Sequence, residues 1–71
     1  MREGETEIEM VRRHVRDGAA IVVRQHELVG RLQANGLATQ AAEQMLAQFE
    51  GAQRQHQEHL DRLEAAQIAG F

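Results

Sequence analysis

The segment LQANGLAT, residues 32–39, is the only strong break in a chain that contains no proline and otherwise spaces its apolar residues as a helix does. Asn-Gly pairs are common in β-hairpin turns, but the apolar residues on both sides recur at helical intervals and do not alternate. The pair is therefore interpreted as a helix end, with Gly36 as the left-handed residue after the C-cap and Leu37 following it in a Schellman motif. The predicted turn covers residues 35–38 and depends on Asn35 and Gly36.

A long helix is predicted before this turn, over about residues 7–34. Its start is indicated by Thr6 and Glu9, which have the spacing of a capping box. Residues 1–5 are expected to fray. The apolar residues of this helix follow one another in steps of three, four and seven, which is a helical stripe: Ile8, Val11, Val15, Val22, Val29 and Leu32.

A second helix is predicted over about residues 39–68, with Thr39 as a plausible N-cap. Its apolar positions are Ala42, Met45, Leu46, Phe49, Ala52, Leu60 and Leu63. Each helix would be about 42 Å long at about 1.5 Å per residue, and a short link between two such helices folds the second back along the first. The sequence therefore predicts one all-α domain, residues 1–71, built as an antiparallel two-helix hairpin.

The charged residues suggest how the two helices align. The register that places most opposite charges face to face pairs Arg31 with Glu43, Arg24 with Glu50, Arg16 with Glu58, and Arg13 with Asp61. The same register brings the small residues 18–20 level with residues 51–52, where the helices could approach closely.

The first helix carries more apolar surface than one partner helix can cover. A second stripe runs beside the first, and together with Phe49 of the second helix it forms the predicted interface: Val11, Gly18, Ile21, Leu28 and Leu32. An apolar stripe of this length needs a cover. We expect a second copy, giving a homodimer with coiled-coil-like packing in a four-helix bundle, although a different protein partner is equally compatible with the stripe.

Composition excludes several classes of protein. The chain has no cysteine, so it can form neither disulfides nor thiolate metal sites. Its formal net charge of −3 argues against nucleic-acid binding. The longest apolar run, residues 18–23, is too short to span a membrane, and the acidic N-terminus lacks the apolar segment of a signal peptide. No phosphate-binding loop or nucleophile elbow occurs. We therefore expect a cytoplasmic protein that is not an enzyme.

Three histidines are candidate metal ligands. His56 and His59 lie three residues apart on one helix face, and the predicted register brings His14 within a turn of them. Three imidazoles could hold zinc, nickel or copper. The spacing alone is a weak signal, and the favoured interpretation is a helix surface beside a seam, with no cofactor.

A further alternative is a small RNA-binding four-helix bundle, because Arg12, Arg13 and Arg16 cluster on the first helix. Its shape is analogous to that of plasmid-copy-control RNA-binding proteins, but no sequence motif supports it.

Residues 22–63 carry a pattern of short motifs. It consists of Arg24–Val29, Gly36, Thr39–Glu43, Leu46–Glu50 and Gln53–Leu60. This pattern resembles a group of small bacterial helical-hairpin proteins that have no established function. The resemblance implies the hairpin and implies no activity. The expected function is self-association, with a role in protein–protein interaction or regulation.

Overall fold

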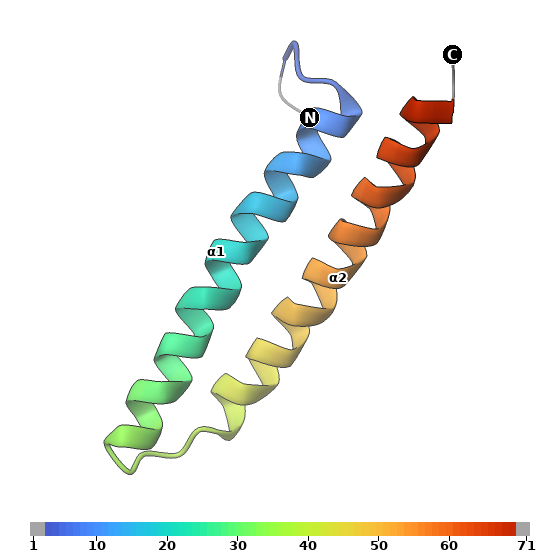
Figure 1. The fold of residues 1–71 in the computed structure, drawn as a ribbon. Coiled ribbons are helices and arrows are strands. Elements are labelled where there is room, and N and C mark those ends of the chain that lie inside the picture. Colours follow the sequence, from blue (N-terminus) through green and yellow to red (C-terminus); the bar gives the residue numbers. More distant parts are fainter. Residues whose placement is uncertain (1–2, 70–71) are drawn as a thin grey trace.

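Two α-helices make up nearly all of the computed structural model, which describes residues 3–69 (Figure 1). α1 comprises Glu7–Ala34 and α2 comprises Gln40–Ala69. The two helices run antiparallel, side by side, with the open end of the hairpin opposite the turn. The described part of the chain contains no strand. The prediction of an all-helical hairpin is therefore confirmed, and both helices have bounds within one residue of the ranges inferred from the sequence.

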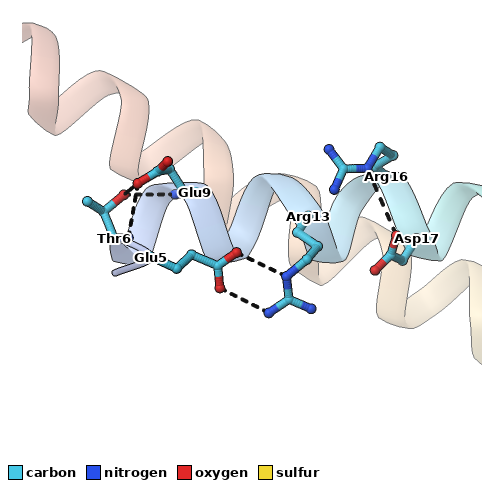
Figure 2. A network of polar contacts seen from close by, with 6 residues as sticks. All are labelled: Glu5, Thr6, Glu9, Arg13, Arg16 and Asp17. Atoms are coloured by element: carbon cyan, nitrogen blue, oxygen red, sulfur yellow. Dashed lines mark hydrogen bonds and ion pairs between the residues drawn. The ribbon is translucent and has the colours of Figure 1, made fainter. Parts of the chain in front are cut away.

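The start of α1 is fixed by the capping box (Figure 2). The Glu9 backbone N–H donates to the Thr6 hydroxyl oxygen at 3.2 Å, and the Thr6 backbone N–H donates to the Glu9 carboxylate at 3.1 Å. The bond from the Thr6 backbone N–H to the charged carboxylate, together with one from the Thr6 hydroxyl at 2.8 Å, holds the pKa of Glu9 below its ordinary value. The capping box inferred from the sequence is confirmed.

The segment before α1 is more ordered than the sequence suggested. Of residues 1–5, the structure describes residues 3–5. Gly4 has a φ of 78°, and Glu5 turns back to accept two hydrogen bonds from the Arg13 guanidinium, at 3.0 and 3.1 Å (Figure 2). The two side chains are only 12% and 17% exposed. The expectation that this segment frays is therefore wrong for Glu5, because a two-point ion pair holds it against the helix.

The turn has the hydrogen bonds of a Schellman motif. Gly36 has a φ of 68°, its N–H donates to the Gln33 carbonyl at 3.1 Å, and the Leu37 N–H donates to the Leu32 carbonyl at 2.9 Å. Asn35 is the C-cap, and its side chain also donates to the Arg31 carbonyl at 2.9 Å. The interpretation of the Asn-Gly pair as a helix end is confirmed.

Two glutamines hold α1 and α2 together along the seam. Gln25, which is 8% exposed, donates to the Ala42 carbonyl at 2.9 Å, and Gln53 donates to the Val15 carbonyl at 2.7 Å. Gly18 makes room for Gln53, since a Cβ atom at this position would collide with the Gln53 side-chain oxygen. The apolar part of the seam is small, and its buried members are Val11, Val29 and Leu60.

The ion pairs differ from those predicted. None of the four expected pairs forms among residues 3–69. Arg13 instead binds Glu5, and Arg16 lies 4.0 Å from its neighbour Asp17. Between the helices, Arg12 approaches Glu64 at 3.5 Å. Exposed ion pairs stabilise a fold by only about 0–1 kcal/mol, so they follow the register that the buried residues set.

Candidate functional site

The hairpin is a flat, elongated layer with two long faces. Its principal extents are 56, 23 and 14 Å. Each helix is covered by its partner on one side only, so the faces above and below the seam remain open. The two faces differ in chemistry, and this difference identifies the candidate functional surface.

Two lines of residues with seven-residue spacing define the first face. His14, Ile21 and Leu28 follow one another along α1, and Phe49, His56 and Leu63 do so along α2. Side chains seven apart share one side of a helix. The His14 and His56 rings contact each other with their centroids 5.5 Å apart, so the two lines lie next to each other across the seam.

This surface, named here the Ile21 face, consists of apolar side chains and two histidines. Helical spacing adds Met10 on the same side of α1 and Met45 on the same side of α2. Ile21 is 36% exposed and Met45 is 49% exposed. The other members are half-buried: Met10, Leu28, Phe49 and Leu63. None of these eight residues is an arginine, an aspartate or a glutamate, but helical spacing places two charged residues, Asp17 and Arg24, beside Ile21 on α1.

The opposite face is charged. It carries the Arg12–Glu64 pair and a contact of 3.8 Å between His26 and Glu50. An open groove between these pairs is lined by Ala19, Val22, Val23, Gln53 and two charged side chains, Glu50 and Arg54. Val23 is 55% exposed on this side. The face is suited to contact with water, since its apolar atoms are interrupted by ionised groups.

The structure divides the predicted interface residues between the seam and the Ile21 face. Ile21 is exposed, whereas Leu28, Leu32 and Phe49 are half-buried. Val11 and Gly18 do not belong to an outer surface. Val11 is 1% exposed inside the hairpin, and Gly18 faces Gln53 of α2. The assignment of these two residues to an outer stripe is wrong, because they lie on the side of α1 that already contacts α2.

The structure brings together only two of the three histidines predicted to converge. His14 and His56 contact each other, and the Nδ1 atom of His56 is buried without a hydrogen-bond partner. His59 lies elsewhere, with its Nε2 atom 3.5 Å from the Glu7 carboxylate. Within residues 3–69 no group of three or more His, Cys, Asp or Glu side chains is placed to hold a metal ion.

The arginine cluster of α1 is occupied by carboxylates. Arg12, Arg13 and Arg16 each lie within 4.0 Å of an acidic side chain. The hydrogen bonds from Arg13 to Glu5 also raise the pKa of that guanidinium above its ordinary value. An anionic ligand would have to compete with these carboxylates for all three arginines.

Comparison with protein-family models, curated proteins and solved structures finds no match to this chain. Neither helix, over the residues that the structure describes, is both long enough and apolar enough to cross a membrane. The surface chemistry of the hairpin is therefore the basis for assigning a function.

Proposed function

We propose that this protein is a non-enzymatic, self-associating helical hairpin whose Ile21 face packs against the Ile21 face of a second copy. Two hairpins then form a four-helix bundle, and the charged faces of both copies remain outside for contact with other macromolecules. The observation that carries this proposal is the apolar Ile21 face, which the fold of one chain leaves partly exposed.

The small core of the hairpin supports this proposal. Only three apolar residues of the described chain are buried to less than one tenth exposure: Val11, Val29 and Leu60. Ordering each residue costs roughly 1–2 kcal/mol of conformational entropy. Chains of this length with so few buried side chains and no disulfide usually obtain further stability from oligomerisation or a metal ion.

The exposed area also supports a partner of standard size. The chain exposes 5278 Å², whereas a compact monomer of its mass would expose about 4,500 Å². The excess of roughly 800 Å² equals the area that one partner contributes to a standard protein–protein interface.

The chemistry of the face favours a second copy over a different protein. A two-fold interface places the same patch on both sides, so a patch with one sign of charge would repel its own copy. The eight residues of the Ile21 face include no acidic residue and no arginine, and the two charged residues beside Ile21, Asp17 and Arg24, have opposite signs. Two copies can therefore meet without a patch of one sign of charge facing itself. Its seven-residue spacing is also the spacing with which helices pack in bundles.

Light scattering coupled to size-exclusion chromatography tests the proposal, with circular dichroism as the check on folding. The parent chain should elute as a dimer at micromolar concentration. Ile21→Glu and Leu28→Glu should each raise the dimer dissociation constant at least about tenfold, because a carboxylate buried without a partner costs about 1–3 kcal/mol or more.

Val23→Glu is the matched control. It introduces the same charge on the same helix, on the opposite face, and at a more exposed position. This variant should remain a dimer. A parent chain that is folded and monomeric at micromolar concentration would refute self-association. Dissociation by Val23→Glu with no effect of Ile21→Glu would mean that the charged face is the interface.

A further inference from the structure

His56 has a buried nitrogen that the fold does not satisfy. Its Nδ1 atom is inaccessible to solvent and has no hydrogen-bond partner. A buried polar atom of this kind destabilises a fold, so native proteins rarely retain one without a reason, such as a bound water or ion. The nearest aromatic ring is that of His14, on the other helix.

The spacing of the two rings suits a shared ion. Their centroids are 5.5 Å apart, with an angle of 46° between the ring planes. Two imidazoles that bind one tetrahedral ion through bonds of about 2.0–2.1 Å have ring centres roughly 5–6 Å apart. We propose that His14 and His56 together bind one divalent transition-metal ion, of the class of Cu²⁺, Ni²⁺ and Zn²⁺, between α1 and α2.

The residues around the pair define the type of site. Imidazole is a ligand that these three ions share. No third His, Cys, Asp or Glu side chain of residues 3–69 completes the site. His59 contacts Glu7 instead. The protein thus supplies only two ligands, so we expect the ion to be exchangeable and the hairpin to fold without it.

The site is independent of self-association, because both ligands come from one chain. It also lies on the Ile21 face, so in the proposed bundle the ion would lie between the hairpins, where helical bundles commonly hold metals. Binding joins α1 to α2. Because the unfolded chain does not hold the two histidines together, the ion stabilises the folded state in proportion to the logarithm of its concentration.

The test uses the full chain without a polyhistidine tag. Isothermal titration with Ni²⁺ or Zn²⁺ should give one ion per chain. Thermal unfolding at a fixed protein concentration should show a melting temperature about 6–11 °C higher at ten times the dissociation constant of the ion. A chelator should reverse this shift and should leave the metal-free protein folded.

Four single variants locate the site. His14→Asn and His56→Asn should each abolish the shift in melting temperature, because a single remaining imidazole cannot link the two helices. His26→Asn and His59→Asn are the matched controls and should retain it. In NMR spectra, Zn²⁺ should move the imidazole signals of His14 and His56 and leave those of His26 unchanged.

Three outcomes would overturn the proposal. One is the absence of any metal-dependent shift in the parent chain. Another is a shift that requires His59 but not His14, which would place the ion on one turn of α2. The third is one ion per two chains, which would place the site between copies. The shift in melting temperature, its dependence on the histidine variants and the ratio of ions to chains can each be measured on a monomer. Failure of the dimer test above would therefore not affect this test.

Discussion

The contact between Gly18 and Gln53 allows a test in which two chemically identical substitutions give different results. Gly18 and Gly30 both lie within α1. A Cβ atom added at Gly30 would meet nothing within 4 Å, whereas one added at Gly18 would collide with the side-chain oxygen of Gln53. Gly→Ala should therefore have its usual helix-stabilising effect at position 30 and should lose that effect at position 18.

The magnitudes follow from the contacts. Replacing glycine by alanine inside a helix stabilises by about 0.8–1.0 kcal/mol, so Gly30→Ala should raise the free energy of unfolding by nearly that amount. Gly18→Ala gains the same propensity but displaces the Gln53 amide from the Val15 carbonyl, 2.7 Å away. Loss of that hydrogen bond costs about 0.5–1.5 kcal/mol. The two effects nearly cancel, so Gly18→Ala should lie within about 0.5 kcal/mol of the parent.

Urea unfolding followed by circular dichroism, at one fixed protein concentration, measures both variants. A double-mutant cycle with Gln53→Ala isolates the contact. In the Gln53→Ala background the collision is gone, and Gly18→Ala should then stabilise by about 1 kcal/mol, as Gly30→Ala does in the parent. Equal stabilisation by the two alanines in the parent chain, or a coupling energy near zero, would refute the assignment of Gly18 as the space for Gln53.

Two further predictions concern the ends of α1. Gly36→Val should destabilise the hairpin by about 1–2 kcal/mol, because Gly36 has a φ of 68° with open space around it and the strain is therefore in the backbone alone. Gly36→Asn should cost less in the same urea experiment, and equal midpoints for both variants would argue against a left-handed residue. The lowered pKa of Glu9 means that its carboxylate stabilises the fold above its ordinary pKa of 4.5, and that this contribution is lost as the pH falls through the lower folded-state value. Glu9→Gln keeps a capping-box side chain without a titrating proton, so its stability should fall less than that of the parent on acidification below pH 4.5. Identical acid sensitivity of the two proteins would remove Glu9 from the explanation.

The parts of the fold that depend on neighbouring residues could be predicted from the sequence. The capping box requires only Thr6 and Glu9, and the turn requires only a residue that tolerates positive φ at position 36. Both signals act over fewer than six residues, where spacing in the sequence determines spacing in the structure. For the same reason the helix bounds could be read from the chain with an error of about one residue.

The alignment of the helices could not be predicted in the same way. Matching arginines to acids gave the wrong pairs, because exposed ion pairs carry too little energy to select a register. A better signal was present in the spacing. Gln25 falls seven residues after Gly18, and Gln53 lies midway between Leu46 and Leu60, so both glutamines occupy seam positions. In a chain rich in glutamine, these two polar residues were indistinguishable by type from those that face water.

The histidines illustrate a second limit of sequence analysis. Spacing joined His56 to His59, and the predicted register placed His14 within a turn of both. The fold does bring His14 against His56, but it places His59 against Glu7. Neighbours on one helix can be identified from the sequence. Neighbours on two helices depend on the rotation of each helix about its axis, which the whole seam determines.

The two glutamine contacts also imply an order of folding. The hydrogen bond from Gln25 to Ala42 joins residues 17 positions apart, and the one from Gln53 to Val15 joins residues 38 positions apart. Closing the longer loop costs about 0.7 kcal/mol more in chain entropy. Once the Gln25 contact has formed, however, the Gln53 contact needs only the next few turns to align. We therefore expect the hairpin to close progressively from Gly36 toward the paired ends of α1 and α2, and to open transiently in the reverse order, with His59 and Glu7 separating first.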